Sequence, residues 1–134
     1  MAVEYSSMRD FNAIDLEKLF LSVEWSSGHY PDKLIIAMKN SSFVSSAWDG
    51  DMLVGLINVL DDGIMTAYVH YLLVHPDYQN KGIGRKLVEL VKEKYKDYLR
   101  IVVIAYNTEI DFYQSCGFSK GDKGSPMFIT SLWT

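Results

Sequence analysis

The chain has 134 residues, a net charge of −4 and a pI of about 5.3. Its length fits a single domain over residues 1–134, and its acidic balance argues against a nucleic-acid partner. The one cysteine excludes an internal disulfide and fits the reducing cytoplasm. We expect no membrane-spanning segment and no signal peptide, because no apolar run is long enough and the first residues lack the required pattern. No metal is expected either, since the three histidines and the cysteine lack ligand spacing.

The first forty residues predict a short strand followed by two helices. The strand covers residues 2–7, and the first helix, which Asp10 caps, carries apolar residues at helical spacing as far as Val23. A break over residues 26–30 precedes Pro31, which suits the first turn of a second helix. Serines at 41 and 42 end that helix.

The rest of the chain predicts a run of strands and then alternating helices and strands. Asp49-Gly50 is a hairpin signal between two apolar runs. The expected elements are strands over residues 43–48, 52–60 and 64–74, a helix over 81–98, a strand over 100–105, a helix over 108–115 and a last strand over 128–132. Mostly antiparallel N-terminal strands followed by a βαβ unit predict an α/β fold with a mixed sheet.

A glycine-containing segment joins the strand that ends at Val74 to the following helix. Glycine lets the backbone approach an anion, and the unpaired N–H groups of a first helical turn point toward it. Leu87 stands where a dinucleotide fingerprint needs its third glycine, and the nucleotide P-loop pattern is absent. We therefore predict a different phosphate-binding loop. Its residues are Gln79, Asn80, Lys81, Gly82, Ile83, Gly84 and Arg85.

A second motif follows that helix. Residues 100–105 read as a strand by their β-branched content, and Asn107 and the stretch Phe112-Tyr113-Gln114-Ser115-Cys116-Gly117-Phe118 come next. Together, Gln79-x-x-Gly82-x-Gly84 and this second stretch resemble the signature of the GNAT superfamily of N-acetyltransferases. The resemblance extends from about Leu53 to Phe118. It implies a GNAT-type acyl-CoA N-acyltransferase fold, with the glycine loop holding the pyrophosphate of acetyl-CoA.

The same resemblance implies how the donor is held and which reaction follows. Backbone groups of Leu72, Leu73 and Val74 would face the pantetheine arm, next to a bulge near Leu73, and Asn107 would hydrogen-bond the arm. The acetyl group would pass directly to a primary amine in a ternary complex. Two alternatives remain open: a non-catalytic module of the same fold that senses CoA or a peptide, and a transferase that uses a different acyl-CoA.

Tyr113 and His70 are the candidate catalytic residues. Tyr113 lies in the second motif, on a helix that Thr108 can cap, and a phenol keeps its proton at neutral pH and can deliver it to a thiolate. An amine of ordinary basicity must lose a proton before it attacks, and a histidine titrates in a suitable range. Alternation along the strand predicts that His70 shares a face with Tyr68 and Leu72. For both residues, ordinary core packing is the alternative interpretation.

The region between the two N-terminal helices is where this family lines its acceptor pocket. Aromatic residues there suit an apolar or cationic amine. The predicted acceptor residues are Glu24, Trp25, His29, Tyr30 and Tyr68. We expect a small-molecule amine as the partner, and a homodimer through sheet edges is compatible with the pattern.

Overall fold

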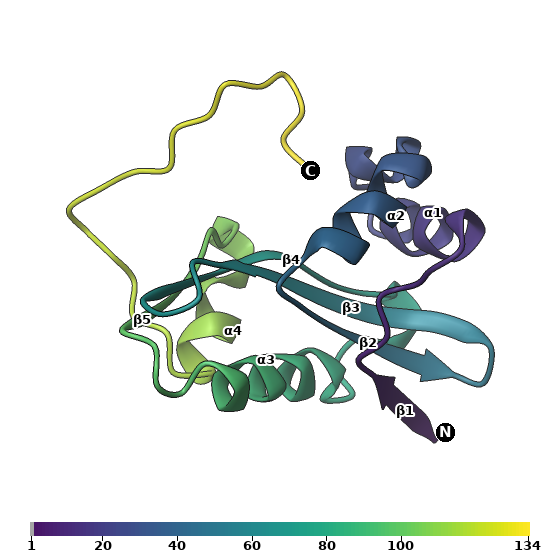
Figure 1. The fold of residues 1–134 in the computed structure, drawn as a ribbon, viewed down its shortest axis with the longest axis horizontal. Helices are drawn as coiled ribbons and strands as arrows, with labels where there is room; N and C mark the ends of the chain where they lie inside the picture. The colour runs from purple at the N-terminus through teal and green to yellow at the C-terminus, as the bar shows by residue number, and fades with distance from the viewer. Residues whose placement is uncertain (1) are drawn as a thin grey trace.

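The computed structural model describes residues 2–134 and is built around a sheet whose strands follow chain order from β1 to β5 (Figure 1). Within this range the first three pairings are antiparallel, and β4 pairs with β5 in parallel. The strands are β1 (Val3–Ser6), β2 (Phe43–Asp49), β3 (Met52–Asp61), β4 (Thr66–Val74) and β5 (Arg100–Val103). The predicted α/β fold with a mixed sheet is confirmed.

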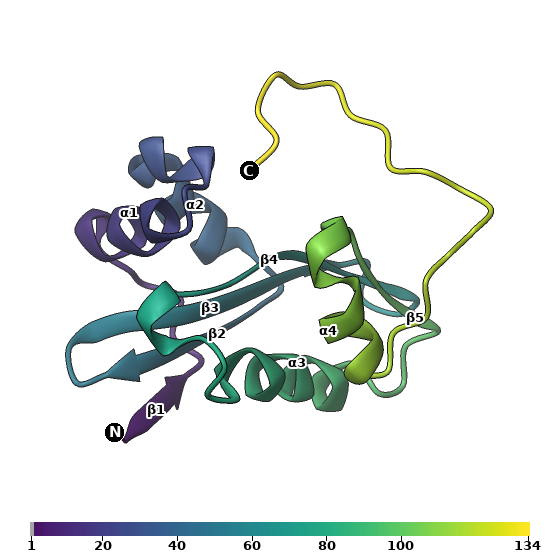
Figure 2. The ribbon, with the colours of Figure 1, turned by 180° about the vertical axis from the view of Figure 1, so that it is seen from behind.

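Helices cover both faces of this sheet. α1 (Ala13–Ser22) and α2 (Pro31–Asn40) lie on one face, whereas α3 (Ile83–Lys94) and α4 (Ile110–Ser115) lie toward the other (Figures 1 and 2). Successive strand residues point to opposite faces, so the central strand β3 feeds two cores. Its Leu56 packs with Phe20 on the α1 side, and its neighbour Ile57 packs with Leu87 on the α3 side.

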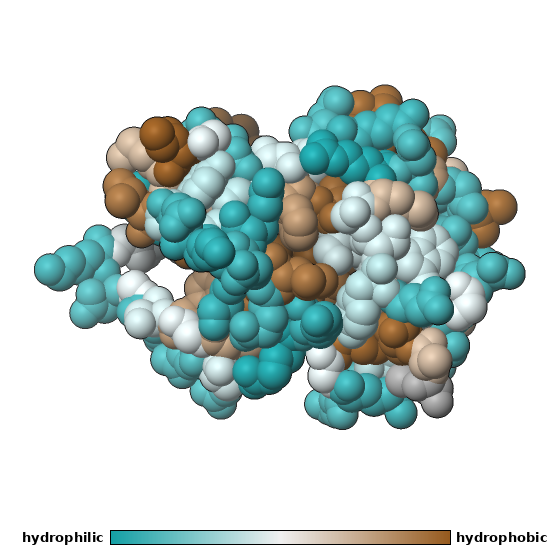
Figure 3. All heavy atoms as spheres, turned by 60° about the horizontal axis from the view of Figure 1, so that its bottom comes forward, coloured by the Kyte–Doolittle hydropathy of each residue, from teal (hydrophilic) through white to brown (hydrophobic). Residues whose placement is uncertain are grey.

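α3 shows why its sequence forms a surface helix. Its buried residues, Ile83, Leu87, Val88 and Val91, recur at helical spacing, and charged residues occupy most of the remaining positions. Figure 3 shows the molecule with the side that carries α3 turned toward the viewer. This face is largely hydrophilic, and hydrophobic surface is recessed between two more hydrophilic regions. This periodicity fixes α3 against β2 and β3.

Several element boundaries differ from the predictions. α1 begins at Ala13 and is capped by Asn12, not Asp10, because the Asn12 side chain accepts the backbone N–H of Asp15 at 2.8 Å. α3 begins at Ile83 instead of residue 81, since Gly82 adopts a left-handed conformation with φ of 85° that a right-handed helix cannot include. It ends at Lys94, before the predicted end at residue 98.

The predicted last strand over residues 128–132 is wrong. Beyond Phe118 the chain arches away from the sheet and returns toward α1 and α2 (Figure 2). Met127 and Ile129 are almost fully exposed. The segment is apolar enough for a strand, but its path never brings it beside a strand that would share backbone hydrogen bonds. Within residues 2–134 no helix combines the length and apolarity that crossing a membrane requires.

Candidate active site

β4 contains a bulge in its pairing with β3. Asn58 of β3 stands opposite Tyr71, but the next residue, Val59, stands opposite Val69, so His70 is an extra residue in β4. An extra residue reverses the alternation of faces beyond it. The bulge therefore lies at His70, not near Leu73 as predicted.

This reversal also corrects the predicted face of His70. The ring of His70 stacks with that of Tyr68 at 5.8 Å and with that of Tyr71 at 4.0 Å between centroids. Leu72, by contrast, packs with the core on the α3 side of the sheet. His70 thus shares a face with Tyr68, as expected, but not with Leu72.

Beyond the bulge, β4 separates from β5. The parallel pairing runs from Thr66 opposite Arg100 to Val69 opposite Val103 and ends there, while β4 continues to Val74 along β3. A strand edge without a neighbour leaves backbone N–H and C=O groups free to bind an extended ligand. Residues 72–74 present such an edge toward the start of α3, except that the Val74 carbonyl already accepts from the Gln79 side chain.

The glycine loop carries the features expected of an anion site. α3 has no side-chain cap at Gly82, and its first backbone bond is the one that Lys86 donates to the Gly82 carbonyl at 3.0 Å. In the described chain, the amides of residues 83–85 therefore have no partner in the loop or first turn. Asn80 is also left-handed, with φ of 62°, and the Gln79 side-chain amide donates to the Val74 carbonyl at 2.9 Å. Gln79 thus closes the loop against the end of β4.

Two adjoining cavities lie where β4 and β5 separate. One has a volume of about 550 Å³ and is lined by residues 72–74 and most of the glycine loop. The other has about 510 Å³ and is lined by Tyr68, His70, Tyr71 and part of the C-terminal segment. Residues that line both cavities form a shared wall: Trp25, Leu72, Tyr106, Glu109 and Tyr113. Following the expectation from the sequence, we call the first the donor-side cavity and the second the acceptor-side cavity.

The predicted site residues divide unevenly between these cavities. Among the loop residues, only Lys81 does not line the donor-side cavity. Asn107 lines the acceptor-side cavity, and its neighbour Thr108 lines the donor-side one. Of the predicted acceptor residues, Trp25 and Tyr68 line the acceptor-side cavity. Glu24, His29 and Tyr30 are exposed outside both cavities.

Tyr113 lies in the shared wall with its ring held between two aromatic neighbours. Its centroid is 5.2 Å from that of Phe112 and 5.5 Å from that of Phe118, both edge-on. Burial, and then the nearby carboxylate of Glu109, raise the pKa of Tyr113 above its usual value, so the phenol stays protonated at neutral pH. The predicted Thr108 cap is wrong, because Asn107–Glu109 form a 3₁₀ turn and Glu109 occupies the cap position of α4 without a capping hydrogen bond.

His70 is exposed toward the acceptor-side cavity, although one side of its ring stacks on the rings of Tyr68 and Tyr71. Burial lowers the pKa of His70 below its usual value, because the surrounding protein disfavours the charged imidazolium. The imidazole is therefore neutral at neutral pH. A neutral imidazole can accept a proton from a group bound in the cavity.

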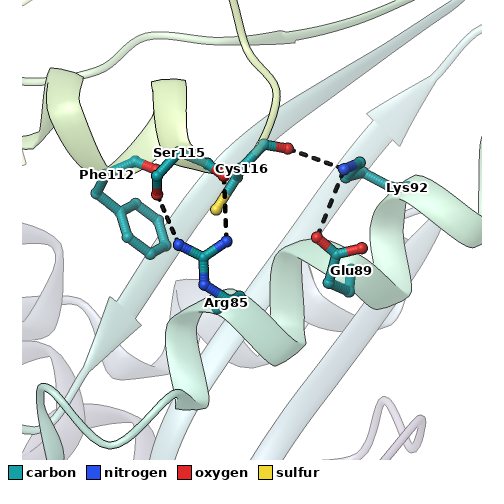
Figure 4. Close-up of polar contacts among 6 residues, drawn as sticks. All are labelled: Arg85, Glu89, Lys92, Phe112, Ser115 and Cys116. Atoms are coloured by element: carbon teal, nitrogen blue, oxygen red, sulfur yellow. Dashed lines mark hydrogen bonds and ion pairs between the residues drawn. The ribbon is translucent and has the colours of Figure 1, made fainter.

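Arg85 is directed toward α4. Its guanidinium donates to the carbonyl of Ser115 at 3.1 Å and to the hydroxyl of Ser115 at 2.7 Å (Figure 4). About two helical turns further along α3, Lys92 donates to the carbonyl of Cys116 at 2.9 Å and pairs with Glu89. Cations at the end of a helix satisfy its last carbonyls and interact favourably with its dipole. Arg85 and Lys92 thus hold α4, which carries the candidate acid, against α3.

The structure adds residues that the sequence did not single out. Tyr71, Tyr106 and Glu109 line the acceptor-side cavity, and the C-terminal segment closes part of its rim. Ser27 donates its backbone N–H to the Thr134 carbonyl at 2.7 Å, which anchors that segment. Tyr106 and Glu109 could have been predicted, because they lie close in sequence to Asn107 and Tyr113. No sequence pattern indicated Tyr71 or the C-terminal segment.

Comparison with known proteins agrees with this geometry. A family model for the acetyltransferase (GNAT) domain matches residues 14–126. An uncharacterized N-acetyltransferase of Prochlorococcus marinus is 32% identical over 128 residues, which cover 90% of this chain and 70% of that protein. GCN5-related N-acetyltransferase 2, chloroplastic, of Arabidopsis thaliana is 30% identical over 90% of this chain, which spans only 55% of that relative.

The solved structures lead to the same class. A GNAT family acetyltransferase of Streptococcus pneumoniae matches with a TM-score of 0.83 and 26% identity, over 97% of this chain and 99% of the other. The fold is thus that of the GNAT acyltransferases. This chain belongs to the GNAT acetyltransferase family.

Proposed function

We propose that this protein transfers an acetyl group from acetyl-CoA to a primary amine by direct attack in a ternary complex. One observation carries the proposal: two cavities share a single wall, which contains Tyr113 and lies where β4 parts from β5. A donor on one side of that wall and an acceptor on the other would meet beside the phenol. Such positioning supplies much of the advantage of an enzyme over solution.

The donor-side cavity suits coenzyme A. The free amides of residues 83–85 would hold the pyrophosphate at the N-terminus of α3, where the helix dipole favours negative charge. The open edge of residues 72–74 would bind the amide groups of the pantetheine arm as an added strand does. A backbone N–H of this edge is also suited to stabilise the oxyanion that develops on the thioester carbonyl.

Each of the two candidate residues would transfer one proton. The amine nitrogen attacks the thioester carbonyl carbon, and the C–S bond breaks as the tetrahedral intermediate collapses. The neutral imidazole of His70, directly or through a water molecule, accepts the proton that the amine loses. Tyr113 donates its proton to the departing thiolate. The products are an N-acetyl amine and free CoA, so no acyl-enzyme is needed.

The acceptor-side cavity favours an apolar or cationic small-molecule amine. Its walls include the rings of Trp25, Tyr68, Tyr71 and Tyr106, which offer apolar contact and cation–π attraction. Glu109 places a carboxylate in the wall, and the chain as a whole is acidic. Both features would attract a protonated amine before it loses its proton.

The decisive experiment is an acetyl-CoA turnover screen that reads free thiol against classes of primary amine. Thiol release with at least one class, and mass spectrometry of the acetylated product, would support the proposal. CoA binding by calorimetry without thiol release would instead favour a sensing module. A panel of acyl-CoA donors would test the acyl preference, and sedimentation would test the proposed homodimer.

The proposed compartment is the cytoplasm, where Cys116, which is buried, would stay reduced. The Arabidopsis relative is described as chloroplastic, so the plastid stroma is the compartment to compare. Fractionation with a tagged full-length protein would distinguish the two.

A further inference from the structure

A buried amide lies in the middle of the central strand. Asn58 of β3 is only 1% exposed, and its neighbours along the strand are apolar. Burying a carboxamide is unfavourable unless its donor and acceptor groups find partners. The partners of Asn58 therefore indicate what its presence achieves.

Both ends of the Asn58 side chain are hydrogen-bonded. Its Oδ1 accepts the backbone N–H of Tyr71 at 2.9 Å, and its Nδ2 donates to the Ser41 hydroxyl at 3.0 Å. The Ser41 hydroxyl in turn donates to the carbonyl of Ala37 in α2 at 2.7 Å. Because a backbone N–H can only donate and the Ser41 proton goes to Ala37, the amide has one consistent orientation.

This hydrogen bond lies at the bulge of β4. Asn58 stands opposite Tyr71, and the register shifts between Asn58 and Val59. A bulge leaves ladder groups without their usual partners, and here a side chain supplies an acceptor to one of them. The bond consequently links the bulge through Ser41 to the end of α2.

The bulge decides the geometry of the site that we propose. It turns the rings of both His70 and Tyr71 to the same side of the sheet, where they line the acceptor-side cavity. It also coincides with the end of the pairing between β4 and β5, beyond which Leu72 lines both cavities. A shift of the bulge would move groups in both cavities together.

We propose that Asn58 is a positioning residue for acyl transfer: by holding the Tyr71 amide it fixes the bulge that aims His70 and opens the edge of β4. This role in catalysis rests on the proposed function. Asn58 touches neither cavity, so its effect passes through Tyr71.

Three variants separate this role from simple support of the core. Asn58→Ala removes the acceptor of the Tyr71 amide. Ser41→Ala is the matched control, because Ser41 is equally buried and belongs to the same network but does not touch the bulge. Asn58→Asp keeps an acceptor oxygen for Tyr71 and serves as the conservative variant.

Amide hydrogen exchange tests the structural part of the proposal without any activity. Exchange at Tyr71, taken relative to Val69, should rise about tenfold in Asn58→Ala, roughly the factor that one hydrogen bond supplies. The ratio should stay near the wild-type value in Ser41→Ala and Asn58→Asp. In the wild-type protein, NMR should also show a coupling across the hydrogen bond between the Tyr71 amide nitrogen and the Asn58 side-chain carbonyl carbon. Absence of that coupling in the folded protein overturns the proposal, even where a variant fails to fold.

Kinetics test the link to acyl transfer. In Asn58→Ala, kcat should fall at least about tenfold with a smaller change in KM, since a small displacement of reacting groups is costly. Ser41→Ala should keep kcat within about twofold although both variants lose thermal stability. Equal kcat in the two variants refutes the positioning role. If the wild type shows the coupling but releases no thiol with any amine, the proposed function fails and the structural role of Asn58 stands.

Discussion

Replacing Tyr113 by phenylalanine tests the catalytic assignment with the smallest change that the site allows. The substitution removes one hydroxyl and keeps the ring, so the edge-on contacts with Phe112 and Phe118 persist. In the described chain the Tyr113 hydroxyl donates to no protein group, hence its loss leaves no protein acceptor unpaired. Folding stability should therefore change by less than about 0.5 kcal/mol.

The expected loss of rate follows from the role of the phenol. General acid catalysis by a positioned side chain contributes about 10²–10⁴-fold, which corresponds to roughly 3–5 kcal/mol of barrier. The raised pKa of Tyr113 keeps the phenol protonated, so the wild type has its acid available across the neutral range. The rate of Tyr113→Phe should thus be lower by about the same factor at pH 6 and at pH 9.

Single-turnover measurement of free thiol isolates the chemical step from product release, and calorimetry measures the affinity for acetyl-CoA. Tyr78→Phe is the matched control, since Tyr78 also lines the donor-side cavity but donates its hydroxyl to Asp49. The control should lose about 1 kcal/mol of stability and keep its rate. An unchanged single-turnover rate in Tyr113→Phe would remove Tyr113 from the mechanism.

Three further substitutions examine the rest of the site. Gly82→Ala should weaken CoA binding about 5- to 30-fold, because a left-handed conformation costs an L-residue about 1–2 kcal/mol. Calorimetry measures the affinity. Gly63→Ala, at a glycine that is equally left-handed but in a distant turn, shows whether the loss is local. In the wild type, kcat/KM should fall on the acid side with a midpoint below pH 6.5, and in His70→Gln this acid limb should disappear. A limb that persists in His70→Gln would mean that another residue is the general base. The lowered pKa also means that the unfolded chain binds this proton more tightly, so the wild type loses stability as pH falls below 6.5 and the variant lacks this loss. Arg85→Met should lower kcat several-fold, because α4 is held less firmly, and should leave the affinity for CoA unchanged. Lys92→Met is the control. A fall in CoA affinity in Arg85→Met but not in Lys92→Met would mean that Arg85 contacts phosphate.

Much of the fold was predictable because its signals are local. The 3.6-residue spacing of Ile83, Leu87 and Val91 marks α3 without reference to any partner. Asp49-Gly50 marks a hairpin, and Gly50 adopts the positive φ that such a turn requires. The error at the start of α1 arose because two polar residues, Asp10 and Asn12, could each cap the helix.

The candidate site was predictable where one segment contains a whole feature. The glycine loop is such a segment, because the strand end, the left-handed Gly82 and the first turn of α3 follow one another along the chain. The second motif singled out Tyr113, which the structure places in the wall between the cavities. What the loop holds and what the tyrosine does stay predictions for the experiments above.

The sequence by itself determined the periodic elements, the turns and the loop before α3, since each depends on residues only a few positions apart. Tertiary structure alone decided the bulge at His70, the contact of Asn58 with Tyr71 and the path of the C-terminal segment. These features depend on which strands pair and in which register. The sequence of β4 alone does not show which residue is the extra one. Only the pairing with β3 shows where the register shifts.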